Sequence, residues 1–370
     1  MSSIEQALTT PLHGWHSENS GRMVEFAGWS MPIQYSSIVD EHNFTRNAVG
    51  LFDVSHMGRL WFQGADVAAA LDGLTTRRVA GVAAGKIRYS LLTNEGGGIL
   101  DDVLVYHLEN ADGPFHMMVV NASNRDKIVQ WLEARLDSSV RVDDRTQSTA
   151  MIAVQGPKAN AQVAQLITLD PDTLGYYEGA AAKYGSTDII VSRTGYTGED
   201  GCELIVPADS AVEIWERLME LAKTAGGGAC GLAARDTLRL EAAMPLYGHE
   251  LSEQFNAGQT SLNFAINAKD REFVGKAPIL AAKKDDSLRI RVGFELEGKR
   301  AARENVPVVV DGNVVGEVTS GTFGPTVQKS ISMGYIDRKF SEPGTQVQFD
   351  IRGKIHQGVV VKMPFYKRNS

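Results

Sequence analysis

The hydrophobic pattern of the chain changes at residue 288, and this change constrains the fold more than any other feature. Over 288–296 the apolar side chains occupy every second position, which is typical of a half-buried strand. Two valine-rich runs follow on either side of Asp311-Gly312, a dipeptide that favours a tight hairpin turn. The alternation returns over 347–351. The sequence therefore predicts a separate all-β domain over residues 286–370.

Helix-like segments alternate with strand-like segments in the preceding part of the chain. Apolar side chains recur at helical spacing over 124–136 and 209–222. Ser37 is a suitable N-cap and Gly50 a suitable stop for a helix over 37–49. These patterns predict an α+β body in front of the β domain.

Two glycine-containing segments receive different interpretations. Gly156-Pro157 favours the start of a helix, because proline is tolerated at the first helical position. The run 226–228 indicates a flexible stop after the preceding helix. It is not interpreted as a phosphate-binding loop, since the Lys-Ser/Thr pair of such loops does not follow it.

Residues 192–204 form the most informative stretch and read Ser-Arg-Thr-Gly-Tyr-Thr-Gly-Glu-Asp-Gly-Cys-Glu-Leu. Strand-like runs flank them at 189–191 and 204–206, so a glycine-bent turn between two strands is expected. The turn offers an aromatic ring and several carboxylates, as a site for a flat, nitrogen-rich heterocycle requires. The residue types alone leave a second interpretation open, a hairpin turn with solvated acids, although loops often carry function.

Composition limits the classes of function. The chain has 370 residues, 43% of them hydrophobic and 22% charged, which is ordinary for a soluble globular protein. The net charge of -8, without a run of basic residues, makes nucleic-acid binding unexpected. Cys202 and Cys230 are the two cysteines, and so few favour a reducing compartment. No apolar run reaches the roughly 18 residues of a membrane span, and residues 1–6 lack signal-peptide features. A cytoplasmic protein without a membrane partner is predicted.

Asp101 and Asp102 are adjacent carboxylates between the glycines 96–98 and the apolar run 103–105. Side chains alternate along a strand, so the two carboxylates are expected on opposite faces, where one can enter a cleft. A carboxylate within an apolar strand is costly unless it is paired, which favours a ligand or a buried partner. The alternative is an acid that caps the glycine turn.

Other combinations of reactive residue types do not define a site. Asp53-Val-Ser-His56 does not indicate a serine-hydrolase triad, because triad residues usually come from distant positions. The eight histidines are scattered without a common metal-ligand spacing, so no metal site is predicted. His56 is expected to be a hydrogen-bonded structural residue beside a pocket, with Met57 as a wall of that pocket.

Blocks from Thr10 to about Phe365 resemble, in family order, the glycine cleavage system T-proteins, a family of folate-dependent aminomethyltransferases. The resemblance covers nearly the whole chain. The blocks that carry it are 26–32, 53–58, 97–102, 121–124, 192–204, 231–241 and 246–249.

The resemblance implies the three-domain folate-binding fold of this family, of class α+β with a C-terminal all-β barrel. A discontinuous folate-binding domain would comprise residues 1–50 and 140–240. An inserted α+β domain would comprise 51–139, a linking segment 241–285, and the barrel 286–370.

The resemblance also implies the site. Asp102 would be the catalytic acid, and Glu203 would hold the amino group and ring nitrogen at the pterin edge of tetrahydrofolate. Further folate contacts are implied at Arg235, Tyr196, Tyr89, Asn121 and Met57. A typical helical arginine would instead pair with a nearby acid, here Asp236 or Glu241. The partners implied are tetrahydrofolate, as co-substrate, and a lipoylated H-protein that carries the aminomethyl group.

The chain departs from the family pattern in places. Ala233 replaces a glycine, Cys202 replaces a phenylalanine, and the segment 256–264 differs from the usual loop. These differences leave three alternatives: a folate-dependent demethylase of a small methyl donor, a non-catalytic folate-binding protein, and a structural interaction module. The second usually carries a Lys-Gly-Cys-Tyr block, which is missing from this sequence. The presence of Asp102, Glu203 and Arg235 disfavours the third.

Overall fold

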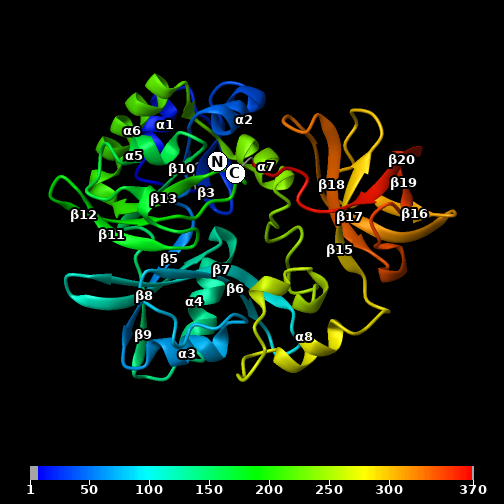
Figure 1. Ribbon diagram of the computed structural model, residues 1–370, viewed down its shortest axis with the longest axis horizontal. Coiled ribbons are helices and arrows are strands. Elements are labelled where there is room, and N and C mark those ends of the chain that lie inside the picture. The colour runs from blue at the N-terminus through cyan, green and yellow to red at the C-terminus, as the bar shows by residue number, and fades with distance from the viewer. Residues whose placement is uncertain (1–6, 369–370) are drawn as a thin grey trace. The chain divides into compact units, whose positions relative to one another are not determined.

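The computed structural model describes residues 7–368, and the chain divides into two compact units (Figure 1). Unit 1 comprises residues 1–72, 78–90 and 103–235, and unit 2 comprises 73–77, 91–102 and 236–370. The expectation about a signal peptide concerns residues 1–6, which lie outside the described residues.

A six-stranded sheet forms the centre of unit 1, in the order β11-β12-β13-β10-β4-β14. Its pairs are antiparallel, except that β14 runs parallel to β4. The strands are β4 (Gly50–Asp53), β10 (Thr149–Gln155), β11 (Gly179–Tyr184), β12 (Thr187–Ser192), β13 (Gly201–Pro207) and β14 (Gly228–Ala229).

Three helices, α1 (His13–Glu18), α5 (Ala159–Val163) and α6 (Ala211–Ala225), lie together on one side of this sheet (Figure 1). The apolar stripe of α6 includes Trp215, which is fully buried in the core against the sheet. The predicted helix over 209–222 is therefore confirmed. The helix expected at Gly156-Pro157 begins two residues later than predicted, since Lys158 is the N-cap of α5.

The helix α2 (Ile38–Asn47) confirms the prediction for 37–49. The side chain of Ser37 accepts a hydrogen bond from the backbone of Asp40, which satisfies an N–H group that the first helical turn leaves unpaired. The helix α4 (Arg125–Glu133) confirms the prediction for 124–136, with Ile128 and Leu132 buried.

The glycines 226–228 stop α6 and lead directly into the strand pairing beside β4. Gly226 caps the helix in the left-handed conformation, with φ 90°. Gly228 then donates a backbone hydrogen bond to Val49 at 3.0 Å, as part of the pairing between β14 and β4. A Cβ at Gly227 would meet the carbonyl oxygen of Val49 at 1.9 Å. The third glycine of the run is thus ordered as a strand, and glycine at 227 permits close backbone approach.

Two further sheets complete the first two-thirds of the chain. A three-stranded sheet has the order β1-β3-β2, formed by β1 (Leu8–Thr9), β2 (Arg22–Phe26) and β3 (Trp29–Gln34). A five-stranded sheet has the order β6-β7-β8-β5-β9, and the division between the units passes through β6 and β7. Its strands are β5 (Gly58–Gly64), β6 (Lys86–Thr93), β7 (Ile99–Asn110), β8 (Gly113–Val120) and β9 (Val140–Asp144). The helix α3 (Val67–Leu74) follows β5 in the chain.

Unit 2 contains a closed barrel in the order β15-β18-β17-β16-β19-β20, filled by a cluster of apolar side chains. The predicted hairpin is confirmed, because Val310 pairs with Asn313 and leaves Asp311 and Gly312 as the turn, with φ 49° and 76°. The barrel strands are β15 (Ile290–Leu296), β16 (Pro307–Val310), β17 (Asn313–Gly324), β18 (Lys329–Ile336), β19 (Gln346–Ile351) and β20 (Lys354–Val361).

The segment before the barrel holds α7 (Leu232–Glu241) and α8 (Lys276–Ala282). Short 3-10 helices occur at Ala122–Asn124, Pro171–Thr173, Ala208–Ser210, Ala257–Gln259, Asn263–Ala265 and Arg338–Phe340. The predicted fold class, α+β with a C-terminal β-barrel, is confirmed. The predicted domain boundaries stay predictions.

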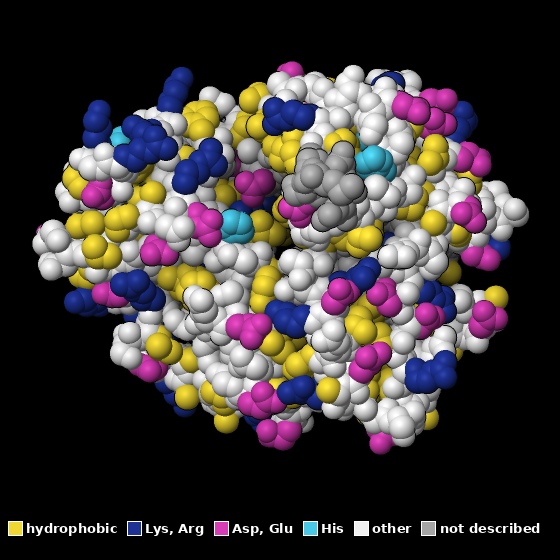
Figure 2. Space-filling model, turned by 180° about the vertical axis from the view of Figure 1, so that it is seen from behind, with side chains coloured by type: hydrophobic (Ala, Val, Ile, Leu, Met, Phe, Trp, Pro, Cys, Tyr) yellow, Lys and Arg dark blue, Asp and Glu magenta, His cyan; other side chains and the backbone are white. Residues whose placement is uncertain are grey.

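Two surface properties bear on the expected partners. No helix within residues 7–368 is long and apolar enough to cross a membrane. On the face shown in Figure 2, basic and acidic side chains are interspersed.

Candidate functional site

The turn that joins β12 to β13 is the first part of the candidate site, and it lies within unit 1. The two strands pair in register from Ile190 with Ile205 to Ser192 with Glu203, so the predicted hairpin is confirmed. Gly201 has φ 145°, and a Cβ there would meet the carbonyl oxygen of Val154 at 2.3 Å. Only glycine fits at this point of the turn.

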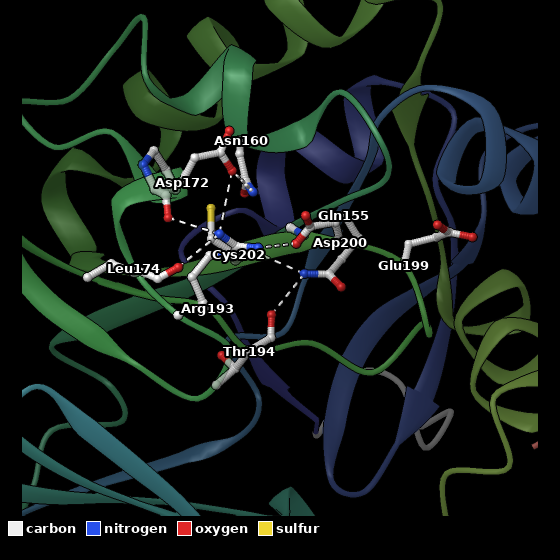
Figure 3. Close-up of polar contacts among 12 residues, drawn as sticks. Gln155, Asn160, Asp172, Leu174, Arg193, Thr194, Glu199, Asp200 and Cys202 are labelled. Carbon is white, nitrogen blue, oxygen red and sulfur yellow. Dashed lines mark hydrogen bonds and ion pairs between the residues drawn. The ribbon is translucent and has the colours of Figure 1, made fainter. Parts of the chain in front are cut away.

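Arg193 anchors the base of the turn (Figure 3). Its side chain is buried and donates hydrogen bonds to the carbonyl oxygens of Pro171 and Leu174, both at 3.1 Å. It also forms an ion pair with Asp200, whose carboxylate accepts the backbone N–H of Gly201 at 2.8 Å. Asp200 is therefore committed to the turn itself.

Arg46, from α2, anchors the tip of the turn. Its guanidinium donates to the carbonyl oxygen of Thr197 at 2.7 Å and lies 3.0 Å from the carboxylate of Glu199. The side chains of Arg46 and Glu199 are only 4% and 5% exposed. A buried ion pair thus holds the tip of the turn. The carboxylate of Glu199, like that of Asp200, is engaged by an arginine.

Gln155, at the end of β10, bridges the two sides of the turn. Its amide nitrogen donates to the carbonyl oxygens of Thr194, at 3.1 Å, and Cys202, at 3.3 Å. Its amide oxygen accepts the hydroxyl of Thr197 at 2.9 Å. The sequence indicated several carboxylates in this turn for a ligand; with two of them engaged by arginines, Glu203 is the candidate that remains.

Glu203 lies on β13 and is 5% exposed. Its Oε2 accepts a hydrogen bond from Thr194, whose hydroxyl is 2.8 Å from that of Ser192, which in turn is 3.4 Å from the hydroxyl of Tyr106. Burial raises the pKa of Glu203, against the hydrogen bond from Thr194 and the charge of Arg235. A carboxylate accepts up to about four hydrogen bonds, so acceptor capacity remains for a ligand.

Arg235, from α7, places its guanidinium 4.6 Å from the centre of the Tyr196 ring. Burial lowers the pKa of Arg235, while the charge of Glu203 and Tyr196 act in the opposite direction. Within the described part of the chain, Arg235 Nη1 is buried and has no hydrogen-bond partner. Asp236, one of the two acids considered as helical partners of Arg235, forms an ion pair with Arg239 at 2.8 Å. A buried carboxylate, a guanidinium and a phenol therefore share one environment.

His56 and Met57 lie in the turn that follows β4. The prediction that His56 is a hydrogen-bonded structural residue is wrong for one of its nitrogens. The side chain is 3% exposed, and no residue of the described chain forms a hydrogen bond with its Nδ1. The sequence gives no signal for this, because a histidine in a turn usually finds a partner or water.

Asp53 connects this turn to the N-terminal helix. Its carboxylate accepts hydrogen bonds from His16 at 2.9 Å, Thr10 at 2.6 Å and the backbone of Ser55 at 2.9 Å. Burial alone would raise the pKa of Asp53, but the hydrogen bond and charge of His16 outweigh it and hold the pKa at about 2. Sequence reasoning missed this buried network, since its members are far apart in the chain.

The other predicted site residues occupy several elements. Tyr89 lies on β6 and Asn121 directly after β8, and both belong to unit 1 with Met57, Tyr196, Glu203 and Arg235. Asp102 belongs to unit 2 and lies on β7. Asp101 is fully buried whereas Asp102 is half-buried, as expected for neighbours that point to opposite faces of a strand.

No group of three or more His, Cys, Asp or Glu residues among 7–368 is arranged to hold a metal ion. The predicted site residues offer carboxylate, guanidinium and phenol groups. Sequence reasoning did not find Thr194 and Tyr106 as neighbours of Glu203. Tyr106 comes from β7, distant in sequence, and carries no local signal of this role.

The fold and this site define an α+β protein with a C-terminal closed barrel and a buried polar group suited to a flat heterocycle. Residues 12–270 match the family described as GCVT N-terminal domain, and residues 289–367 match the glycine cleavage T-protein C-terminal barrel domain. The chain belongs to the glycine cleavage T-protein family.

Known aminomethyltransferases are similar to this chain over nearly its whole length. An aminomethyltransferase of Symbiobacterium thermophilum is 39% identical over 374 residues, which cover 98% of each chain. An aminomethyltransferase of Bacillus cereus is 38% identical over 362 residues, covering 97% of this chain and 98% of the relative. The crystal structure of the glycine cleavage system aminomethyltransferase T from Bartonella henselae superposes with a TM-score of 0.89 at 32% identity, covering 97% and 98%.

Proposed function

We propose that the chain is an aminomethyltransferase of the glycine cleavage system. It transfers the methylene carbon of an aminomethyl group, bound through sulfur to the lipoyl arm of an H-protein, to two nitrogens of tetrahydrofolate. Ammonia is released, and the dihydrolipoyl thiol remains on the H-protein. Similarity over nearly the full length to relatives named aminomethyltransferase supports this activity. The observation that carries the folate part of the proposal is the buried carboxylate of Glu203 together with Arg235, whose guanidinium stacks on the Tyr196 ring.

These residues suit the two ends of a pterin edge. The carboxylate of Glu203 can accept hydrogen bonds from the amino group and the neighbouring ring nitrogen in a bidentate arrangement. Arg235 Nη1, which is unpaired within residues 7–368, can donate to an oxygen on the same edge. We assign Tyr196, Asn121 and Met57 as further contacts of the folate, on the basis of their positions in the family blocks. Tyr89 is assigned with them because the family resemblance implies an aromatic contact at this position.

Asp102 is proposed as the catalytic carboxylate. Positive charge develops at the transferred carbon as ammonia leaves, and an ionised carboxylate beside that carbon would stabilise it. The same carboxylate would orient the reacting nitrogen of tetrahydrofolate, which supplies the nucleophile that takes up the carbon. The position of Asp102 at the end of the glycine-rich block supports the assignment, as does its half-buried state on β7.

A cytoplasmic location is part of the proposal. Both cysteines are buried thiols, which is compatible with a reducing compartment. The folate-dependent demethylase and the non-catalytic folate-binding protein remain alternatives that experiment distinguishes. Neither would release ammonia from an aminomethylated H-protein.

The test of Asp102 is the variant Asp102→Asn, compared with the exposed Asp112→Asn as a matched control. We expect Asp102→Asn to bind tetrahydrofolate with unchanged affinity and to lose about 10²–10³-fold in turnover, since one electrostatic stabiliser of the transition state is removed. Stopped assays of ammonia and methylenetetrahydrofolate measure the turnover. A turnover within a few-fold of that of Asp112→Asn contradicts the catalytic role.

A further inference from the structure

His56 is held in a turn whose backbone has little freedom. The turn joins β4 to β5, and Asp53 accepts the backbone N–H of Ser55 at 2.9 Å. The N–H of Met57 donates to the carbonyl oxygen of Val54 at 3.1 Å. The position of His56 is therefore set by local hydrogen bonds on both sides.

Arg59 adds a second constraint on the same turn. This arginine is fully buried and donates to the carbonyl oxygens of Ser55, at 3.0 Å, and Met57. Its other nitrogens donate to the backbone and hydroxyl of Thr149, at 2.9 Å and 2.7 Å. Hydrogen bonds from Arg59 to residues on both sides of His56 thus hold the backbone of the turn in place.

The imidazole of His56 nevertheless has a nitrogen without a hydrogen-bond partner in the described chain. The ring of Phe26 meets it edge to face, with centroids 5.6 Å apart and an interplanar angle of 84°. Among residues 7–368 nothing forms a hydrogen bond with His56 Nδ1. Buried polar atoms of native proteins are nearly always paired, so an exception in a rigid turn points to a function.

Arg235 carries a second buried nitrogen without a hydrogen-bond partner in the described part of the chain, and its charge acts on His56. Arg235 Nη1 also has no hydrogen-bond partner within the described residues. Burial lowers the pKa of His56 to about 3, and the charge of Arg235 acts in the same direction. The imidazole is therefore neutral at neutral pH, with one nitrogen as donor and the other as acceptor.

We propose that His56 is a further folate-binding residue, whose Nδ1 forms a hydrogen bond with a nitrogen or oxygen on the edge of the bicyclic ring. The inference rests on the proposed tetrahydrofolate site. It adds a polar contact to those of Glu203 and Arg235 and gives a role to a nitrogen of His56 that has no hydrogen-bond partner among residues 7–368. A neutral imidazole serves either as donor or as acceptor, so it tolerates either kind of ring atom.

The experiment compares three variants with the unmodified chain by titration calorimetry with tetrahydrofolate under anoxic conditions, and by urea unfolding. His56→Phe removes the polar nitrogen and keeps an aromatic ring. His56→Asn keeps a polar atom near the position of Nδ1. The control His116→Phe removes a different buried nitrogen, since His116 Nε2 is also without a partner in the described chain and its ring stacks on His107.

We expect the Kd of tetrahydrofolate to rise about tenfold in His56→Phe and to stay within about threefold of the original value in His56→Asn. The urea midpoint of His56→Phe should be unchanged or higher, because an unpaired buried polar atom has been replaced by an apolar one. The control should leave the Kd unchanged. A structural role for His56 would give the opposite pattern for stability.

An unchanged Kd in His56→Phe, or an equal loss of affinity in His56→Phe and His56→Asn, overturns the inference. A fall in the urea midpoint of His56→Phe overturns it as well. If the unmodified chain fails to bind tetrahydrofolate, the proposed function itself is contradicted. The two failures are therefore distinguishable.

Discussion

Removal of Arg46 is expected to destabilise the protein strongly, although this arginine is outside all the family blocks that identify the site. The guanidinium of Arg46 lies 3.0 Å from the carboxylate of Glu199 and donates to Thr197 at 2.7 Å. Both members of the ion pair are at most 5% exposed. Arg46→Ala leaves the carboxylate of Glu199 buried without its guanidinium.

The magnitude follows from the burial. Breaking a buried ion pair by removing one partner costs about 3–5 kcal/mol, because the remaining charge stays desolvated. Arg217 and Glu220 on α6 provide the matched control, since their side chains are 54% and 65% exposed. Arg217→Ala should cost at most about 1 kcal/mol, because water solvates both charges.

Urea unfolding followed by circular dichroism measures the change in free energy for both variants. A cycle of Arg46→Met, Glu199→Gln and the double variant separates the pair from other contacts, and we expect a coupling of about 1–3 kcal/mol. The affinity for tetrahydrofolate should fall in Arg46→Ala, because Tyr196 depends on the anchored turn. A cost of Arg46→Ala as small as that of Arg217→Ala, with no coupling in the cycle, refutes the reasoning.

Two further predictions concern titrating carboxylates. Burial raises the pKa of Glu203, so its ionisation opposes folding at neutral pH, and its contribution to stability improves as pH falls through the raised pKa. Glu203→Gln should therefore not lower the free energy of unfolding but should raise the Kd of tetrahydrofolate at least about tenfold. The unmodified chain should bind tetrahydrofolate more weakly as pH falls through the raised pKa of Glu203. The effect of pH on stability has the opposite sign for Asp53, because folding lowers its pKa from 3.8 to about 2. The ionised Asp53 stabilises the fold at pH values above its pKa in the unfolded chain. This stabilisation is lost as pH falls towards the pKa in the folded chain. Asp53→Asn should cost about 2 kcal/mol in urea unfolding at neutral pH, and a variant as stable as the original would contradict the network around His16.

Features with a local physical cause could be predicted from the sequence. Ser37 caps α2 through a contact within three residues, and Asp311-Gly312 adopts the positive φ angles that its hairpin requires. Gly226 ends α6 in the left-handed conformation for the same reason. The hairpin around Tyr196 could also be predicted, because glycines separate two apolar runs.

Features that depend on residues distant in the sequence could not be predicted. Glu199 and Arg46 are 153 positions apart, and nothing in either segment indicates their ion pair. Gly228 is part of a strand because it pairs with Gly50 of β4. The prediction of a flexible stop used only neighbouring residues, so it did not include this pairing. The incomplete hydrogen bonding of His56 is a property of its packing, so it is visible only in the folded chain. The site residues stay predictions from the family resemblance, whereas the contacts that anchor the turn, such as the ion pair of Arg46 with Glu199, carry no signal in the sequence.

Formation of both products from purified components tests the central proposal most directly. The purified chain, tetrahydrofolate and aminomethylated H-protein are combined, and ammonia and methylenetetrahydrofolate are measured with and without the lipoylated partner. The account predicts that both products form in equal amounts and only when the H-protein is present. Binding of tetrahydrofolate without release of ammonia would contradict the proposed aminomethyltransferase activity.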